Sequence, residues 1–172
     1  INHDKEIANC TLYLKSSIID FIVNPKINQV QKFQIENVGF GKNNWEIICS
    51  DVENNRLESE ERNLTIFKPF SYGGKTTNLA RVQNIGRVFD FVLEKQQSGK
   101  ISFSEPVDLS SGIDFDSIVS IGHNFIGINS ELAPQLNVAA TLTFYDVDFQ
   151  DPVILRDGEV CEDCEIISND GN

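Results

Sequence analysis

Apolar and polar residues alternate along most of this chain with a period of two, the pattern that predicts short β-strands. Two predicted strands each have one wholly apolar face, formed by Cys10, Leu12 and Leu14 in the first and by Trp45, Ile47 and Cys49 in the second. We expect both faces to point into the same apolar layer, because half-buried strands turn alternate side chains inward. Other strands are predicted over residues 18–24, 32–38 and 62–68, and their spacing is typical of a β-sandwich. The first domain should therefore span residues 1–68.

A change of composition begins at Pro69 and the glycine-containing stretch 71–75. A short helix is predicted next, capped by Thr77 or Asn78, and it is the only helix expected. Strands then resume over residues 87–95, 99–107, 117–129, 139–149 and 151–168.

Alternation also assigns side chains to faces in these later strands. One face is expected to carry Phe89, Phe91 and Leu93. In the strand over 139–149, the set Ala140, Leu142 and Phe144 should lie opposite the set Thr141, Thr143 and Tyr145. The sequence thus predicts an all-β protein with two consecutive β-sandwich domains, residues 1–68 and 69–172.

Three stretches of the first domain, "NCTLYLKSS", "NNWEIICSDVENN" and "SEERNLTIF", resemble the Ig-like repeats of large archaeal surface and secreted proteins. The matching positions are Asn9, Cys10, Leu12, Tyr13, Leu14, Trp45, Cys49, Asp51, Asn54, Asn55 and residues 62–66. Residues 98–166, with "GKISF", "ATLTFY" and "PVILRDGEVC", look like the β-domain that often accompanies such repeats.

The resemblance implies further strands before "NCTLYL" and after the last cysteine. The closing Asn169-Asp170-Gly171 is also a turn signal that normally introduces a strand. We therefore expect either a fragment of a longer surface protein or a subunit whose sheets are completed by strands from neighbouring chains.

Charge narrows the possible partners. The chain has 14 basic and 26 acidic residues, a net charge of −12, and from Ile101 onward Arg156 is the only base. The negative electrostatic potential of this chain repels phosphate backbones, so nucleic acid is not expected as a partner. No apolar run of about 18 residues is present, so no membrane span is expected in this chain.

The four cysteines suit either disulfides or thiol chemistry. Cys10 and Cys49 lie on strands that resemble neighbours in an Ig-like sandwich, so a bridge between them is favoured over two reduced thiols. The Cys161/Cys164 pair has the spacing of a redox motif or of half a zinc site. We favour a structural disulfide there, over zinc shared with another chain and over redox chemistry, because the acidic neighbours disfavour a thiolate.

Few other residues suggest chemistry. His3 and His123 stand alone in unrelated segments, and no nucleophile, zinc-protease, phosphate-loop or dinucleotide motif occurs. The acid pairs Asp114/Asp116 and Asp146/Asp148 could help hold Ca²⁺, although a solvated acidic surface is the favoured interpretation. Sequons for N-linked glycans begin at Asn9 and Asn63, each on a strand face expected to point outward.

Together these features predict a non-enzymatic structural module of an extracellular, cell-surface assembly, a filament or surface layer, with no catalytic residue, metal or cofactor. Its expected partners are identical subunits or adjacent repeats, joined through β-strand complementation. The alternative is an adhesive or carbohydrate-binding module in which Phe70, Tyr72 or Tyr145 stacks on sugars. A hydrolase is the least favoured reading.

Overall fold

The structure is a computed structural model that describes residues 6–168. This part of the chain is all-β and consists of antiparallel sheets, none of which closes into a barrel. Its described residues form two compact units: unit 1 contains the chain up to Pro69 together with Asp108–Asp114, and unit 2 contains Phe70–Val107 and the chain from Phe115 onward. The all-β prediction is confirmed, and the stacking of two sheets into a sandwich stays a prediction.

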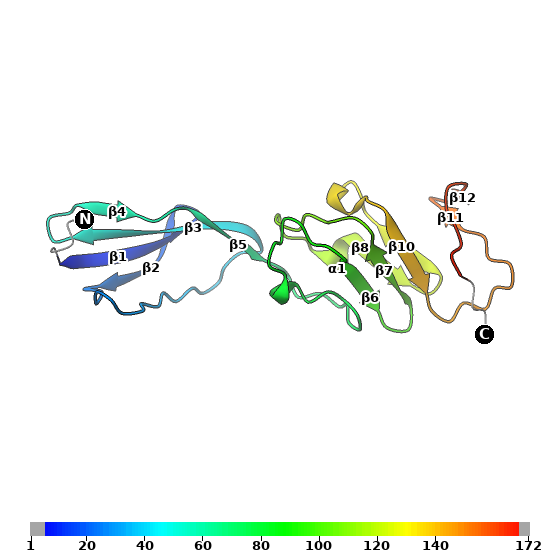
Figure 1. The fold of residues 1–172 in the computed structure, drawn as a ribbon, viewed down its shortest axis with the longest axis horizontal. Coiled ribbons are helices and arrows are strands. Elements are labelled where there is room, and N and C mark those ends of the chain that lie inside the picture. Colours follow the sequence, from blue (N-terminus) through cyan, green and yellow to red (C-terminus); the bar gives the residue numbers. More distant parts are fainter. Residues whose placement is uncertain (1–5, 169–172) are drawn as a thin grey trace. The chain divides into compact units, whose positions relative to one another are not determined.

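Unit 1 has one sheet with strand order β2-β1-β3-β4, in which β5 also pairs with β3 (Figure 1). Its strands are β1 (Ile7–Leu14), β2 (Ser17–Val23), β3 (Gly41–Asp51), β4 (Arg56–Glu58) and β5 (Arg62–Ile66). The register of β1 against β3 sets Leu14, Leu12 and Cys10 opposite Trp45, Ile47 and Cys49. The prediction that these two apolar faces meet in one layer is confirmed.

The hairpin between β1 and β2 turns through Lys15 and Ser16, whose φ angles of 47° and 63° match the turn that suits the twist of paired strands. After β2 the chain runs beside that strand without regular structure until β3 (Figure 1). The predicted strand over residues 32–38 is therefore wrong. Asn37 has a positive φ, and the Gln34 N–H donates to the Asp20 carboxylate, so this backbone is not paired with a strand.

A later segment, Asp108–Asp114, belongs to unit 1. Its Gly112 lies so close to Gly41, the first residue of β3, that a Cβ on Gly112 would meet the Gly41 Cα at 2.6 Å. The Thr65 hydroxyl donates to the Ser110 carbonyl at 3.0 Å. Unit 1 is thus built from two separate stretches of chain, whereas the sequence predicts one continuous first domain.

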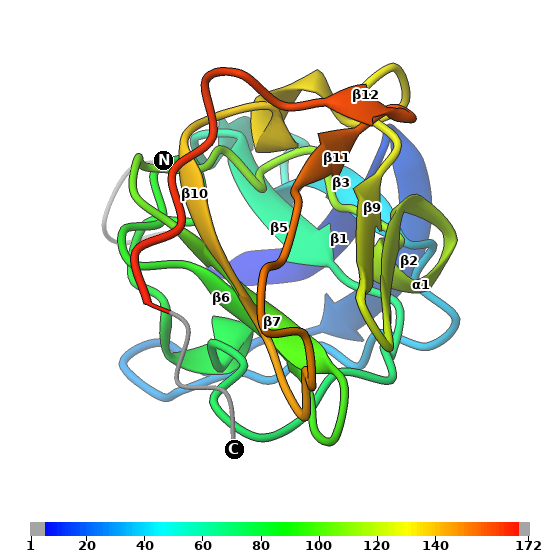
Figure 2. The ribbon, with the colours of Figure 1, turned by 90° about the vertical axis from the view of Figure 1, so that its right-hand side faces the viewer.

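Unit 2 is organised around a three-stranded sheet of order β10-β7-β6, whose strands lie side by side in Figures 1 and 2. The strands of this unit are β6 (Val92–Lys95), β7 (Gly99–Phe103), β8 (Val119–Gly122), β9 (Phe125–Ile128), β10 (Ala140–Phe144), β11 (Leu155–Arg156) and β12 (Glu159–Val160). The β8–β9 hairpin contacts β6 and β7 through β8, and β11 pairs with β12.

The core of unit 2 forms between the buried faces of these strands and the one-turn helix α1 (Phe115–Ile118). Its fully buried side chains include Phe91, Leu93, Ile101 and Phe115. The Phe91 ring stacks on Phe103 with 5.5 Å between centroids. Burial of this many large apolar groups stabilises the unit, since each contributes about 1.5–3 kcal/mol relative to exposure.

The predicted short helix is a single turn of 3-10 helix, η1 (Leu79–Arg81). Its cap is Asn78, whose side chain accepts a hydrogen bond from the Ala80 N–H, and not Thr77. The expectation of a single helix is wrong, because two other turns form, α1 (Phe115–Ile118) and η2 (Pro134–Leu136). Within residues 6–168 the longest helix has four residues, too short to cross a bilayer.

The faces predicted in unit 2 are confirmed only in part. In β10 (Ala140–Phe144) neither predicted face is buried, since Leu142 is 45% exposed. Phe91 and Leu93 are fully buried, whereas Phe89 is 60% exposed. Asp90, between Phe89 and Phe91, has a φ of +48°, and this change in backbone direction breaks the alternation of faces. Phe89 is covered instead by Arg87, whose guanidinium carbon lies 5.0 Å from the ring centroid.

Candidate functional site

A disulfide joins Cys10 to Cys49 on the neighbouring strands β1 and β3. The two residues are direct cross-strand partners, with 4.0 Å between their Cα atoms. The bond therefore lies within one sheet and fixes the register of its two central strands. It closes a sequence separation of 39 residues, which restricts the unfolded chain strongly.

A second disulfide joins Cys161 to Cys164 directly after β12. The preceding hairpin turns through Asp157 and Gly158, and Arg156 pairs with Asp163 at 2.9 Å inside the disulfide loop. This hydrogen-bonded guanidinium holds the pKa of Asp163 below its usual range. Cys161, Asp163 and Cys164 are the one group of three possible metal ligands in the described chain, and both sulfurs are already bonded to each other.

Glu94 in β6 is a buried charged residue of unit 2, and 8% of the residue is exposed. It accepts hydrogen bonds from the Lys75 N–H and from the Tyr145 hydroxyl, the latter at 2.9 Å. The bond from Lys75 holds the pKa of Glu94 below its ordinary value, against the opposing effect of burial. Burial, and then the hydrogen bond to Glu94, raise the pKa of Tyr145.

This carboxylate fastens residues 73–77 along the outer side of β6. The Gly73 N–H donates to the Glu94 carbonyl at 2.9 Å, and the Glu94 N–H donates to the Thr76 hydroxyl at 2.8 Å. Thr77 pairs with Val92 in the same way, through its backbone N–H and its hydroxyl oxygen. The arrangement closes an edge of the three-stranded sheet that would otherwise be free to pair.

Gly74 makes room for the carboxylate. Its φ is +57°, and a Cβ at this position would lie 2.5 Å from Glu94 Oε2. The sequence predicts no role for Glu94, and it suggests Tyr145 only as a sugar-stacking residue. A partial signal exists, since Glu94 directly follows two apolar residues of β6 and a Gly-Gly pair occurs about 20 residues earlier in the chain.

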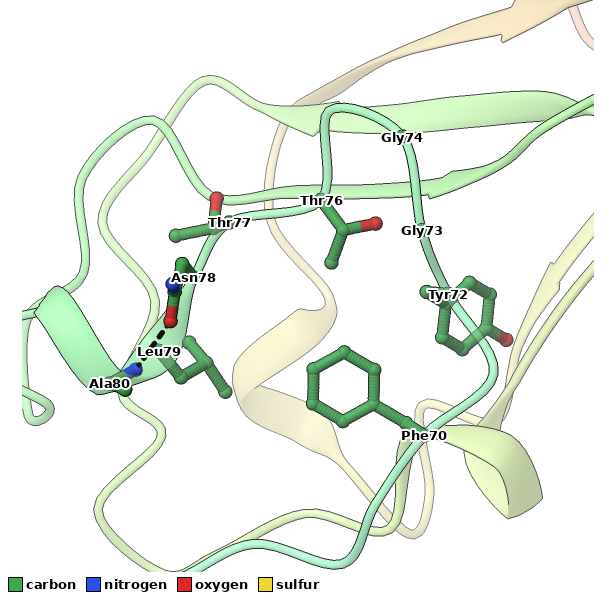
Figure 3. A pocket seen from close by; sticks show the side chains of 9 residues that line it. All are labelled: Phe70, Tyr72, Gly73, Gly74, Thr76, Thr77, Asn78, Leu79 and Ala80. Atoms are coloured by element: carbon green, nitrogen blue, oxygen red, sulfur yellow. Dashed lines mark hydrogen bonds between the residues drawn. The ribbon is translucent and has the colours of Figure 1, made fainter.

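A hollow of about 340 Å³ lies beside this loop (Figure 3). Its lining consists of Phe70, Tyr72, Gly73, Gly74 and residues 76–80. The Tyr72 hydroxyl donates to the Val119 carbonyl, and burial, aided by the Asp116 charge, raises the pKa of Tyr72 to about 12. The Asn78 side chain is held by the Ala80 N–H, as Figure 3 shows.

The aromatic residues suggested for sugar stacking are all half-buried. Phe70 packs edge-on against Phe115 with 5.2 Å between centroids, and the hydroxyls of Tyr72 and Tyr145 are bonded inside the protein. The hydroxyls of Thr76 and Thr77 accept hydrogen bonds from the Glu94 and Val92 N–H groups, and the side-chain oxygen of Asn78 accepts one from the Ala80 N–H. The hollow therefore offers a ligand little beyond its shape.

The candidate Ca²⁺ ligands are not brought together. Asp114 pairs with Lys68 in unit 1, while Asp116 in unit 2 accepts hydrogen bonds from the backbone and hydroxyl of Ser71. Asp146 and Asp148 are exposed.

Of the two histidines, His123 lies among the described residues. His123 is exposed in the turn between β8 and β9. His3 and the closing Asn169-Asp170-Gly171 lie outside the described residues.

The two sequon asparagines have different surroundings. Asn63 is exposed on β5. Asn9 is half-buried on β1, which is paired on both sides, with Val23 and Ser50 as its cross-strand partners. Asn63 is therefore the more accessible position for a glycan.

The largest feature that the sequence analysis did not locate is an apolar surface on and after β2. We define the edge patch as Ile18, Phe21, Val23, Ile27 and Val30, which are between 57% and 90% exposed. β2 is an end strand and pairs with β1 alone. The signal was present in "SIIDFIV", where apolar residues occupy both faces, as in a strand buried on both sides.

A long, exposed apolar edge strand is a template for pairing with another chain. This surface is a candidate binding site, because its apolar side chains are exposed beside a strand edge that has no strand partner in the described chain. Comparisons with family models, with curated proteins and with solved structures find no match to this sequence.

Proposed function

We propose that this protein is a non-enzymatic structural module of an extracellular surface assembly, a filament or surface layer, in which copies or adjacent repeats join through their sheet edges. The observation that carries the proposal is the edge patch. Its strand β2 presents Ile18, Phe21 and Val23 at about 60% exposure beside an open edge. Residues 24–40 run beside β2 and contact it through the Gln34 N–H and the Asp20 carboxylate, but they do not pair with it as a strand, so this edge has no strand partner within the described residues.

The two disulfides support the extracellular setting, because disulfides persist in oxidising compartments. They also suit a module that must keep its fold outside the cell. The net charge of −12 keeps free subunits soluble while they carry an apolar edge.

Unit 1 itself supports joining by strand or sheet addition. All five of its strands belong to a single sheet, whereas an Ig-like sandwich, which the sequence resembles, has two. A neighbouring copy or repeat that adds strands to this sheet would bury the apolar side chains of β2. A glycan on Asn63 is part of the same proposal, whereas a glycan on Asn9 would lie beside its cross-strand partner Val23 and would obstruct this contact.

The test is the association state of the oxidised full chain, measured by sedimentation velocity over a wide concentration range and followed by electron microscopy. We expect reversible, concentration-dependent association and, at high concentration, filaments or sheets. A chain that stays monomeric up to about 1 mM, where even an association of about −4 kcal/mol would be seen, would rule the proposal out.

A further inference from the structure

A second exposed apolar surface lies at the other end of the described chain. We define the tail patch as Val153, Leu155, Val160, Ile166 and Ile167, which are between 47% and 75% exposed. Residues 165–168 make no backbone hydrogen bond with the described part of the chain. Their sequence, Glu-Ile-Ile-Ser, is rich in β-branched residues that favour strands.

The two patches have opposite local charge. Residues 15–33, which contain the edge patch, carry three lysines and one acid. The acid is Asp20, which already accepts the N–H groups of Phe21 and Gln34. Lys15, Lys26 and Lys32 are exposed, and none forms an ion pair with a residue between 6 and 168.

The tail patch is surrounded by acids. Residues 153–168 contain five acidic side chains and one base, Arg156, and that base is paired with Asp163. Glu159, Glu162 and Glu165 are exposed and remain to face a partner. A lysine-bearing apolar surface and an acid-bearing apolar surface on one chain are complementary, and charge complementarity steers such surfaces together and fixes their register.

We propose that the edge patch of one copy binds the acidic tail patch of a second copy, with residues 165–168 lying extended beside β2. The contact pairs the backbone of the tail with the edge of β2. Adjacent residues of a strand point to opposite faces, so one of Ile166 and Ile167 packs against Phe21 and Val23, and the other packs on the opposite face of the sheet. It is heterologous, since two different surfaces meet, and repeated contacts of this kind build chains of subunits. This inference rests on the proposed function and names the surfaces that carry it.

The decisive experiment uses two variants of the oxidised full chain. Phe21→Glu places a charge in the edge patch. The double substitution Ile166→Ser with Ile167→Ser removes apolar side chains from the tail patch. Each variant alone should associate at least about tenfold more weakly than the unmodified chain. The matched control is Phe125→Glu in the β8–β9 hairpin, because Phe125 is 58% exposed and Phe21 is 62% exposed. It should associate normally.

Mixing the two variants separates this contact from others. The edge variant keeps its tail and the tail variant keeps its edge, so the mixture should form a one-to-one pair that grows no further. If the tail variant still associates by itself like the unmodified chain, the contact is symmetric and the inference fails. The inference also fails if the mixture stays monomeric. In both cases association of the unmodified chain would leave the proposed function standing, whereas a monomeric unmodified chain would overturn both.

A charge-exchange experiment tests the same contact with substitutions of exposed charged residues. Its outcome does not depend on whether Phe21→Glu or the double variant at Ile166 and Ile167 folds. Lys26→Glu and Glu165→Lys should each weaken association, and a mixture of the two should recover it. Raising the salt from about 0.1 M to about 1 M, which shortens the screening length from about 10 Å to about 3 Å, should remove the difference between matched and mismatched charges. Equal association of all four combinations at low salt would show that the acids and lysines do not meet.

Discussion

At the scale of single residues, Glu94 shows how this chain keeps a buried charge. Its carboxylate is nearly enclosed, yet it receives the Lys75 N–H and the Tyr145 hydroxyl. Hydrogen bonds to the ionised form offset the cost of removing it from water. The residue thereby converts a glycine-containing loop into a fixed cover for the edge of β6.

Glu94→Gln should lower the free energy of unfolding of unit 2 by about 1–3 kcal/mol at neutral pH, because a charge-assisted acceptor is replaced by a weaker one. Amide hydrogen exchange in β6 and chemical denaturation would measure it. The control is Glu105→Gln, since Glu105 is exposed in the same unit. Equal losses in the two variants would mean that the Glu94 contacts contribute nothing special.

The same substitution has a defined pH dependence. The folded pKa of Glu94 lies below its unfolded value, so its stabilising effect is fully present above the unfolded pKa of about 4.3. The effect is lost as the pH falls through the folded pKa. The stability difference between the native chain and Glu94→Gln should therefore shrink on acidification below about pH 4. A difference that grows on acidification would contradict the assignment.

At the scale of elements, the central pair β1 and β3 is fixed by its register and by the Cys10–Cys49 disulfide together. The second disulfide acts on a much shorter loop, between residues only three apart. Chain entropy predicts different contributions from the two, because the restriction of the unfolded chain grows with loop length.

Replacing Cys10 and Cys49 by serine should cost about 4 kcal/mol, whereas replacing Cys161 and Cys164 should cost about 2 kcal/mol at most. Trp45 is the only tryptophan and lies in β3, so its fluorescence reports on unit 1 during denaturation. The first pair of substitutions should shift the Trp45 transition strongly, and the second pair should leave it in place. The Cys161/Cys164 variant is measured in its own unit, by amide hydrogen exchange in β6 and β7. A larger loss there than the Cys10/Cys49 variant shows in unit 1 would contradict the loop-length argument.

At the scale of the whole molecule, unit 1 depends on a segment that follows it by some 40 residues in the chain. Asp108–Asp114 reaches unit 1 through the Thr65–Ser110 hydrogen bond, the Lys68–Asp114 pair and the approach of Gly112 to Gly41. Residues on both sides of this segment belong to unit 2. The chain thus crosses between the units three times.

Gly112→Ala should destabilise unit 1 by about 1–2 kcal/mol or more, because Gly112 has a φ of +75° and a Cβ there would meet the Gly41 Cα. Trp45 fluorescence would follow the loss. Gly122→Ala in β8 is the control, since its Cβ would meet nothing within 4 Å. An unchanged Trp45 transition in Gly112→Ala would show that the segment is not needed by unit 1.

The sequence by itself determined the all-β class, most of the strands and the meeting of the faces around Cys10 and Cys49, because strand alternation is a local property of the chain. It did not determine the irregular path over residues 32–38 or the exposure of Phe89, where a few backbone angles override propensity. Only the tertiary structure placed Glu94 under its loop, attached Asp108–Asp114 to unit 1 and left β2 at an open edge. Each of these depends on contacts between residues far apart in the chain, which no local pattern records.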